Sequence, residues 1–587
     1  MTLSPSLDLA AQEAFLSLDV YTSTFILVCA TLFLLRRLAM PKPLPGIPYD
    51  PESAKRIFGD LPGFAGASNE REWVLSHGMK LQSPIFQIFL KPFQKPFVFV
   101  TDFYEMAEIS MRRTKEFDRS YLTIGMLEGI IPEQLVTLHS HDPKYKKNKE
   151  LVRDLMSPTF LQKVSAPHIY AAVLRTIGLW DKKLDLCGGQ PFEAGEDVHH
   201  AALDMIVVSA FGLDVEKTHL VKKHSFLRPG SVPDKNEKHM NQVFEFEDVP
   251  LDPELGALTT LAESTRYALR SPFPRLLHWY NRNFSPTMKG AQSLVREMRH
   301  REIAASIKRR DDGQTEWCAL DHMIARETAI AEKEGRQANF HTQAIASELL
   351  GYLIGGHETT SAAIRWGIKF LTDDQRCQSS LRNALRAAYP AAVSENRLPS
   401  LSEILKTHVP YLDAVVEENL RCGKVLSMTL RDALVDTEVL GMSIPKGTSV
   451  GIVSIGPGMT TASTTIPFDE SKYTRGPAAK EYMQKYGRFD DVGIETYYPE
   501  RWLKATTDDK GREVTDFDAN AGPILAFGKG PRACFGRKLA YLEMRIFFTL
   551  VFLKYTFDGI PRELAGHEET VYLTRAPTNV FVKLGQV

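Results

Sequence analysis

The chain has 587 residues, 43% hydrophobic and 24% charged, which is typical of a globular protein with one very large domain or several smaller ones. Its 71 basic and 72 acidic residues give a formal net charge of −1, so nothing points to nucleic acid as a partner. Six scattered cysteines form no disulfide framework, which suits a reducing compartment.

The first predicted element is a membrane anchor. Residues 20–35 carry no charge and would span about 24 Å as a helix, close to the roughly 27–30 Å of a bilayer core. A cleaved signal peptide is the alternative, but acidic residues precede this run, and Arg36 and Arg37 follow it. By the positive-inside rule we expect a non-cytosolic N-terminus at residues 1–19, one transmembrane helix at residues 20–37, and the remaining chain in the cytosol.

A proline-rich hinge follows at residues 38–49, and we expect it to be an extended spacer outside the core. Helical periodicity then dominates residues 50–225, interrupted by a β-rich run at residues 97–101. Residues 226–260 are rich in Pro, Asp and Lys and predict a long surface connection. The C-terminal residues 571–584 predict a hairpin.

A long apolar helix is predicted at residues 345–371, although it contains the run GGHETT at residues 355–360. Glycine and threonine each disfavour a helix interior by several tenths to about 1 kcal/mol, so a reason other than helix stability is expected. Glycine lets a flat ligand approach the backbone, and threonine can open the hydrogen-bond ladder to water. Taken alone, the run is more typical of packing or a kink, and His357 is expected to be satisfied locally.

The most informative stretch is the loop FGKGPRACFG at residues 527–536. Its glycines and proline exclude a regular interior, and helical periodicity from Arg537 places Cys534 just before a helix start. Unpaired amides at a helix start favour the thiolate, which is the form of cysteine that binds a soft metal. No C-x-x-C pair supports a closed zinc site, whereas haem iron needs a single axial thiolate.

Two other interpretations fit parts of this loop. A buried cysteine is usually an inert small hydrophobe. Residues 524–527 as a strand, followed by Gly528, Gly530 and Ala533, also fit the spacing of a dinucleotide-binding turn, with Asp558 as the ribose acid. Fewer than 60 residues follow this turn, which is too few for a doubly wound sheet.

The loop matches the haem-binding loop of the cytochrome P-450 monooxygenases at all five fixed positions, Phe527, Gly530, Arg532, Cys534 and Gly536. Over residues 50–587 the chain resembles this family. The resemblance implies a haem-thiolate catalytic domain that is mainly α with a smaller β region, preceded here by the transmembrane helix. It also implies haem b as cofactor, with its iron bound by the Cys534 thiolate.

The resemblance assigns roles to further residues. Glu358 and Thr359 stand where the family has an acid and a threonine that pass protons during oxygen activation. Candidate cofactor-binding residues, mostly at propionate-contacting positions, are Phe527, Arg532, Arg431, Tyr145 and Lys149. The last two replace the family's usual tryptophan and arginine, so a solvated basic face is their alternative interpretation.

A structural triad is also implied. Glu418 and Arg421 lie three residues apart on a predicted helix at residues 411–421, where an exposed ion pair would be worth at most about 0.5 kcal/mol. In the family this pair is buried and joined by an arginine from a Pro-Glu-Arg segment, here Arg501. Such a triad would pin the helix to the segment that leads to Cys534.

The implied activity is insertion of one oxygen atom from O2 into a lipophilic small molecule, by hydroxylation or epoxidation, with electrons from a separate NADPH-dependent cytochrome reductase. The long loops and Tyr145 are reminiscent of fungal biosynthetic members, so we expect a secondary metabolite as substrate. The expected location is the endoplasmic reticulum membrane, with the catalytic domain in the cytosol. Two alternatives stay open: an O2-independent haem-thiolate isomerase or dehydratase, against which Glu358 and Thr359 argue, and a non-catalytic haem-binding protein.

Overall fold

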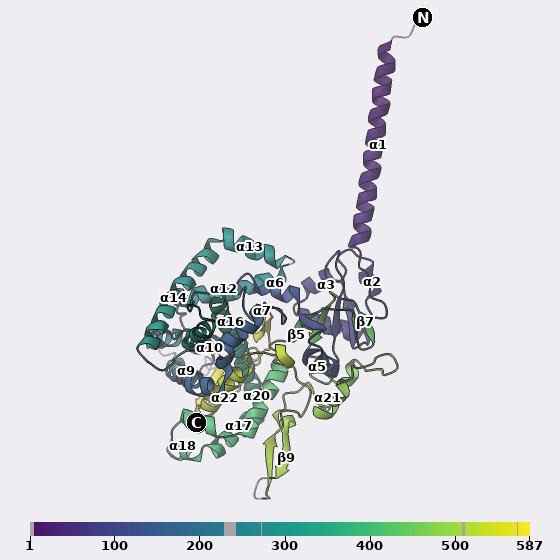
Figure 1. Cartoon of the computed structure of the whole chain (residues 1–587). Helices are drawn as coiled ribbons and strands as arrows, with labels where there is room; N and C mark the ends of the chain where they lie inside the picture. Colours follow the sequence, from purple (N-terminus) through teal and green to yellow (C-terminus); the bar gives the residue numbers. More distant parts are fainter. Residues whose placement is uncertain (1–4, 228–241, 272, 508–510, 572) are drawn as a thin grey trace.

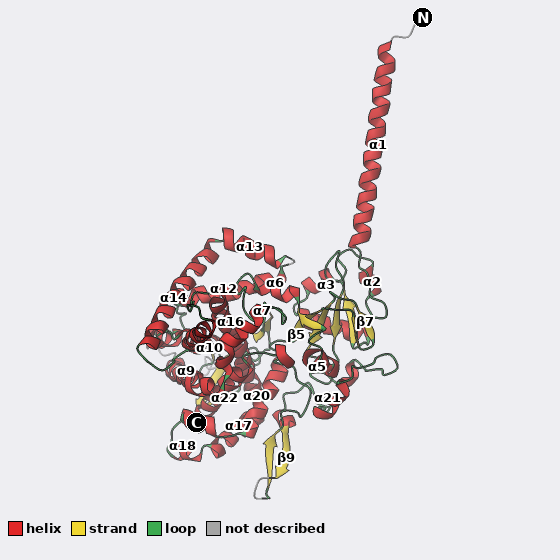
Figure 2. Ribbon diagram, viewed as in Figure 1, coloured by secondary structure: helices red, strands yellow, loops and turns green. Residues whose placement is uncertain are grey.

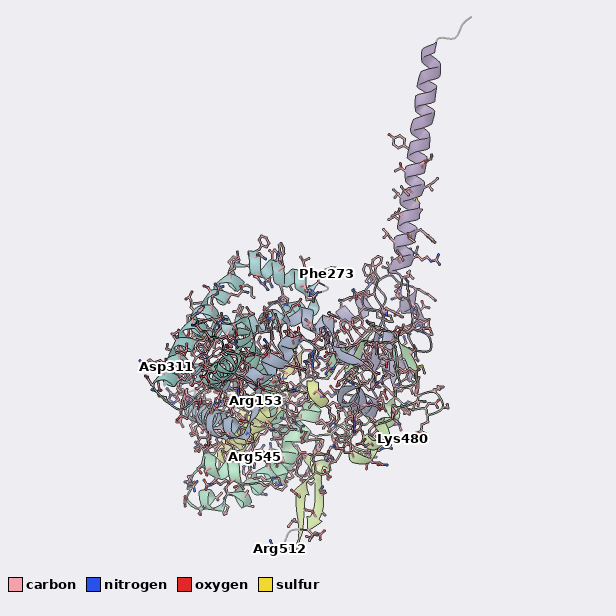
Figure 3. All side chains as sticks on the ribbon, viewed as in Figure 1. Arg153, Phe273, Asp311, Lys480, Arg512 and Arg545 are labelled. Atoms are coloured by element: carbon pink, nitrogen blue, oxygen red, sulfur yellow. The ribbon has the colours of Figure 1, made fainter. Side chains whose placement is uncertain are left out.

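The computed structural model of the protein describes residues 5–227, 242–271, 273–507, 511–571 and 573–587 (Figure 1). Its first element, α1 (Pro5–Ala39), extends away from the rest of the chain as a single rod (Figure 1). From Tyr21 onward the side chains of α1 project on all sides (Figure 3). The stretch Tyr21–Ala39 is long and apolar enough to cross a membrane, and only 6% of it is buried, so α1 is not a core helix.

The proline-rich segment after α1 is bound to the domain. Gln87, in strand β1 (Ile85–Ile88), donates from Nε2 to the carbonyls of Leu44 (2.9 Å) and Ile47 (2.7 Å). Its Oε1 accepts the Leu44 amide (2.8 Å). Ile47 is 2% exposed, so the expectation that this segment stays outside the core is wrong at that residue. One buried amide side chain satisfies the backbone groups that an extended chain leaves unpaired.

A five-stranded sheet forms the smaller part of the domain, with strand order β1-β2-β8-β5-β3. Strands β2 and β8 are parallel, and the other neighbours are antiparallel. The predicted strand near residues 97–101 is confirmed as β2, and it is buried at every position because α4 and α5 cover its two faces. The bounds are β2 (Phe97–Val100), β3 (Phe117–Arg119), β5 (Met428–Ala433), β8 (Ser449–Val453), α4 (Glu70–Leu81) and α5 (Phe103–Met111).

The larger part of the domain is helical (Figure 2), and the helices predicted at residues 345–371, at residues 411–421 and from Arg537 are confirmed. Its longer helices are α9 (Ala166–Cys187), α10 (Gly195–Phe211), α12 (Pro253–Arg270), α13 (Pro274–Phe284), α14 (Pro286–Asp311), α15 (Ala319–Glu334), α16 (Gln343–Asp373), α17 (Gln375–Ala388), α20 (Pro410–Gly423) and α22 (Arg537–Lys554). The shorter helices are α2 (Pro51–Ala54), α3 (Leu61–Gly66), α6 (Tyr121–Leu127), α7 (Pro143–Val152), α8 (Pro158–Phe160), α11 (His219–Phe226), α18 (Pro390–Ser394), α19 (Leu401–Lys406) and α21 (Ala479–Lys485).

Two glycines of the GGHETT run in α16 have different surroundings. A Cβ on Gly356 would overlap the side chain of Ile206 in α10, so this glycine is explained by close helix packing. Gly355 is exposed and would place a Cβ in open space. Of the two, only Gly355 leaves the backbone of α16 accessible.

The C-terminal residues form two separate pairings, so the prediction of a single hairpin is wrong. Strand β12 (Glu569–Val571) pairs with β13 (Arg575–Pro577), whereas β14 (Phe581–Gln586) joins β11 (Tyr555–Asp558) and β4 (Phe192–Glu193). The chain leaves the first pairing because Val580 binds the end of β4. The Val580 amide donates to Oε1 of Glu193, and the Val580 carbonyl accepts the Ala194 amide.

Two further hairpins complete the described strands. They are β6 (Thr437–Val439) with β7 (Met442–Ile444), and β9 (Leu503–Thr507) with β10 (Glu513–Phe517), which projects from the domain (Figure 1). Within the predicted surface connection at residues 226–260, residues 228–241 lie outside the described residues, and residues 242–252 have no regular structure.

Candidate active site around Cys534

The loop around Cys534 is held by its own backbone and by α5. The Cys534 amide donates to the carbonyl of Phe527 (2.8 Å), which closes the loop. Gly530 has a φ of +75° and lies so close to α5 that a Cβ would overlap the carbonyl of Ser110. The helix α22 begins at Arg537, directly after the loop. The predicted order of tight loop and helix start is confirmed, and Gly530 is required by contact with α5.

The sulfur of Cys534 is solvent-accessible although protein surrounds much of it. Burial raises the pKa of the Cys534 thiol, whereas the amides of Gly536 and Arg537 and the charge of Arg537 lower it. The helix-start amides therefore favour the thiolate, as expected, but burial outweighs them. A bound metal cation would supply the missing positive charge, because it deprotonates a ligating thiol.

Three arginines converge beside this loop. They are Arg532 in the loop, Arg431 on β5 and Arg119 on β3. Arg119 and Arg431 lie directly opposite each other in the antiparallel β3–β5 pair, where like charges destabilise a sheet. Burial, followed by the charge of Arg532, lowers the pKa of Arg431 to about 10. Burial and the two neighbouring arginines lower the pKa of Arg119 well below its usual value.

The nearby carboxylate of Asp118 compensates these charges only in part. It lies 3.6 Å from Nε of Arg532, but it also accepts the amide of Arg119 (2.8 Å) and the amide (2.7 Å) and hydroxyl (3.0 Å) of Ser140. The Nε atoms of Arg119 and Arg532 are buried and have no hydrogen-bond partner among the described residues. Unpaired guanidinium donors in a positive environment fit a ligand that carries carboxylates. Haem has two such groups, its propionates, so these residues fit the cofactor that the loop predicts.

Of the other predicted propionate contacts, Tyr145 lies against Arg532, and Lys149 lies on the exposed side of Tyr145. The guanidinium of Arg532 lies 4.6 Å from the centre of the Tyr145 ring. Lys149 is exposed, and its Nζ lies 6.0 Å from the same ring. Sequence reasoning missed Arg119, because its place opposite Arg431 depends on the pairing of two strands that are far apart in the chain.

The predicted proton-passing residues lie on α16. The hydroxyl of Thr359 donates to the carbonyl of Gly355 (2.7 Å), which is the acceptor that the backbone ladder also uses at this turn. Burial raises the pKa of Glu358, the carboxylate of Glu263 on α12 raises it further, and Arg266 opposes both. A raised pKa suits a carboxyl group that must hold a proton near neutral pH.

A buried hydrogen bond connects α16 to the helix that follows Cys534. The hydroxyl of Thr360 donates to Oε2 of Glu543 on α22 (2.9 Å), and burial raises the pKa of Glu543 to about 8.

His357 faces α10, where its ring lies 5.0 Å from that of His199, and its Nδ1 lies 3.3 Å from the carbonyl of Leu353. The prediction that His357 is satisfied locally is confirmed at Nδ1 only, because its buried Nε2 has no hydrogen-bond partner among the described residues.

The predicted triad residues lie together in the core. Glu418 accepts from Nε (2.8 Å) and Nη2 (2.7 Å) of Arg421 and from Nε of Arg501 (3.1 Å). The Trp502 indole (3.0 Å) and the Tyr498 amide (2.8 Å) also donate to it. Burial would raise the pKa of Glu418, but Arg421 and Arg501 outweigh burial and hold it below its usual value. The group links α20 to residues 498–502, which precede the Cys534 loop.

The comparison with known families decides the identity of the fold. A model described as "Cytochrome P450" matches residues 50–458 and 495–583. The chain belongs to the cytochrome P450 family. It is 32% identical to "Cytochrome P450 monooxygenase TRI13" of Fusarium sporotrichioides, over 97% of this chain and 99% of that protein. It is 34% identical to "Cytochrome P450 monooxygenase xilC" of Penicillium crustosum, over 100% and 98% of the two chains.

The fold of this P450 is shared with a solved structure, "Crystal structure of cytochrome P450DA heme domain", at a TM-score of 0.64 and 17% identity over 93% of this chain and 98% of that one. The family, the fold class and the haem-thiolate oxidoreductase class predicted from the sequence are thus confirmed. The dinucleotide-binding alternative is wrong, since residues 524–527 form no strand. The roles of individual site residues stay predictions.

Proposed function

We propose that the protein is a membrane-anchored monooxygenase that uses haem b to insert one oxygen atom from O2 into a lipophilic small molecule, by hydroxylation or epoxidation. The observation that carries this proposal is the arrangement around Cys534, where an accessible cysteine precedes a helix beside three incompletely compensated arginines. The description of its relatives as cytochrome P450 monooxygenases supports it.

In this proposal the residues around Cys534 bind and orient the cofactor. The sulfur of Cys534 ligates the iron, and Arg119, Arg431 and Arg532 bind the propionates, with Tyr145 packed against Arg532. Phe527 holds the loop closed through its carbonyl. When bound, thiolate-ligated haem supplies the reductive activation of O2.

Glu358 and Thr359 hold and pass protons on the α16 side. Burial and the carboxylate of Glu263 raise the pKa of Glu358, which favours its protonated form. The Thr359 hydroxyl, which is bonded to the Gly355 carbonyl, has to release that carbonyl before it can donate elsewhere. The triad of Glu418, Arg421 and Arg501 has a structural task, because it fixes the segment that leads to the cysteine loop.

We place the protein in the endoplasmic reticulum membrane, with α1 as a single-pass anchor and the catalytic domain in the cytosol. Arg36 and Arg37 at the C-terminal end of α1 support this orientation. A second membrane contact is supported by α13, which lies at the end of the domain from which α1 extends (Figure 1). Exposed apolar side chains on and just before α13 are Phe273, Leu276, Trp279, Tyr280 and Phe284.

The electron donor in this proposal is a separate NADPH-dependent cytochrome reductase. Helix α7, beside Arg532, carries exposed lysines at positions 144, 146, 147 and 149. A basic helix of this kind attracts an acidic protein surface, and the attraction weakens with salt. Lys149 belongs to this basic face, which is the alternative that the sequence left open for it.

The substrate class proposed here is a lipophilic secondary metabolite. Three of the relatives are fungal P450 monooxygenases of nearly the same length, one from each of Fusarium, Pestalotiopsis and Penicillium. An O2-independent isomerase or dehydratase is the second candidate, and the presence of both Glu358 and Thr359 argues against it.

Two experiments test this function. Reduced protein exposed to carbon monoxide should give the absorption band of thiolate-ligated haem, and Cys534→Ala should abolish it while the anchor variant Cys29→Ala keeps it. A band that survives Cys534→Ala would exclude this residue as the ligand.

Thr359→Ala should release more peroxide per electron and form less product, whereas Thr372→Ala should behave as wild type. Thr372 makes the same bond to the preceding turn about three and a half turns further along α16.

A further inference from the structure

The connection between α6 and α7 contains a short segment, residues 133–138, that lies between α16 and the cysteine loop; we call it the bridging segment. On one side, Oε1 of Glu348 in α16 accepts the amide of Leu135 (2.8 Å), and Oε2 accepts the side-chain amide of Gln134 (3.0 Å). The side chain of Asn148 in α7 reaches the same carboxyl group (3.3 Å). Glu348 therefore binds both the backbone and a side chain of the bridging segment.

On its other side the bridging segment binds the cysteine loop. Arg532 donates from Nη1 to the carbonyl of Leu135 (3.3 Å) and from Nη2 to the carbonyl of Leu138 (2.5 Å). The amide and the carbonyl of one residue, Leu135, thus connect Glu348 on α16 to Arg532 in the loop. These contacts use both terminal nitrogens of Arg532, and its Nε, 3.6 Å from Asp118, has no hydrogen-bond partner among the described residues.

A glycine on α16 adds a second contact to the bridging segment. The side chain of Gln134 packs on Gly351, one turn beyond Glu348, so closely that a Cβ there would overlap it. Gln134 also accepts the amide of Val136 with its Oε1, so its side chain helps to shape the segment. Seating this segment on α16 therefore depends on both Glu348 and Gly351.

Burying a carboxyl group at position 348 lowers the stability of the fold unless its hydrogen bonds compensate for the lost hydration. Glu348 is 4% exposed in an apolar helix, and burial raises its pKa to about 8 against the donors of Leu135, Asn148 and Gln134. Among the described residues no cation shifts the pKa of Glu348, so hydrogen bonds and not an ion pair hold it there. Buried carboxyl groups are retained where their hydrogen bonds fix a particular arrangement.

We propose that Glu348 is a positioning residue, which fixes the bridging segment on α16 and thereby holds Arg532 in the orientation that binds a haem propionate. The inference rests on the proposed haem function, but the attachment of the segment to α16 does not. Arg532 has a long side chain with several rotamers, and two backbone acceptors fixed in space reduce the conformational cost of binding.

The test compares Glu348→Ala, Glu348→Gln and Gly351→Ala in the full chain. The control is Asp204→Ala, because Asp204 is another buried carboxyl group that accepts two backbone amides, those of His219 (3.0 Å) and Leu220 (2.9 Å), away from the site. Hydrogen exchange of residues 133–138 should accelerate about tenfold or more in Glu348→Ala and Gly351→Ala, but not in Asp204→Ala. Glu348→Gln should largely restore protection, since its amide oxygen can still accept from Leu135.

Transfer of haem from the protein to excess apomyoglobin tests the link to Arg532. Glu348→Ala should accelerate transfer about tenfold in the wild-type background and less than twofold in an Arg532→Ala background, because the effect passes through that arginine. Equal acceleration in both backgrounds, or unchanged exchange at residues 133–138, would overturn the inference. A wild-type protein that takes up no haem would contradict the proposed function, while exchange in the apoprotein would still decide whether Glu348 seats the segment.

Discussion

Two neighbouring carboxyl groups on α20 should respond differently to the same substitution. Glu417 and Glu418 are both buried, at 4% and 0% exposure. Arg421 and Arg501 hold the pKa of Glu418 below its usual value against the effect of burial, so it is a carboxylate. Burial raises the pKa of Glu417, which accepts the hydroxyl of Tyr541, so its neutral form is favoured. Glutamine mimics a neutral carboxylic acid but not a carboxylate.

The magnitude follows from what each substitution leaves behind. Glu418→Gln leaves Arg421 and Arg501 buried, at 2% and 8% side-chain exposure, without their counter-charge. Removing one partner of a buried ion pair costs about 3–5 kcal/mol, a large part of the roughly 5–15 kcal/mol that stabilises a typical protein. Glu417→Gln keeps the shape and a polar contact to Tyr541, so we expect a loss of about 1 kcal/mol or less.

Urea unfolding of the haem-loaded variants measures both values, with circular dichroism for the helices and the carbon monoxide difference spectrum for the haem site. Glu418→Gln should unfold at much lower urea than Glu417→Gln. Equal losses would contradict the assigned charge states, and a larger loss in Glu417→Gln would mean that the ions are assigned to the wrong residue. Arg501→Lys keeps the charge but loses the guanidinium geometry, so its loss should lie between the two.

Three further predictions follow from the structure. Arg119→Gln should accelerate haem loss about tenfold yet raise the melting temperature of the apoprotein, because it removes a like charge opposite Arg431; a less stable apoprotein would contradict this. Gly530→Ala should abolish the carbon monoxide band, whereas Gly528→Ala, at a φ of +63° and with only an ordinary contact to Cα of Ala533 (3.9 Å), should cost only about 1–2 kcal/mol and keep it. Burial lowers the pKa of His199 to about 3 and that of His357 to about 4, below the 6.5 of an ordinary histidine, so the unfolded chain binds these protons more readily. Stability should therefore be complete above pH 6.5 and fall as the pH drops toward 4, by about 2 kcal/mol at pH 5 for His357, and urea unfolding of His357→Gln should show a shallower decline.

The parts of the protein that the sequence predicts well depend on residues close together in the chain. The cysteine loop, the helix start at Arg537, the long helix α16 and the Glu418–Arg421 spacing are all local patterns. Where the structure departs from these predictions, the cause is a contact between residues that are far apart in the chain. Gln87 draws Ile47 into the core, and the end of β4 diverts the C-terminal strand from its local partner.

The positions of the polar residues that surround the cysteine loop also depend on contacts that the sequence does not predict. Arg119 becomes a candidate only when β3 is known to pair with β5, and Glu348 only when residues 133–138 are known to lie on α16. Sequence spacing reveals neither role: the predicted helix at residues 345–371 contains Glu348 but does not indicate what its side chain contacts, and Arg119 lies outside the predicted strand at residues 97–101. The direction of the Cys534 pKa shift also depends on how deeply the folded chain surrounds the sulfur.

The arginines separate into two groups by what surrounds them. Arg421 is buried, but Glu418 outweighs burial and raises its pKa, so this cation stabilises the fold. Arg431 is also buried, but burial and the charge of Arg532 lower its pKa to about 10. Its chain neighbour Asp432 accepts instead from the Tyr121 amide and the Ser449 hydroxyl. Adjacency of opposite charges in a sequence therefore does not establish an ion pair. A fold that compensates one buried arginine fully and others only in part, beside an accessible cysteine, leaves positive charge there that suits an anionic ligand.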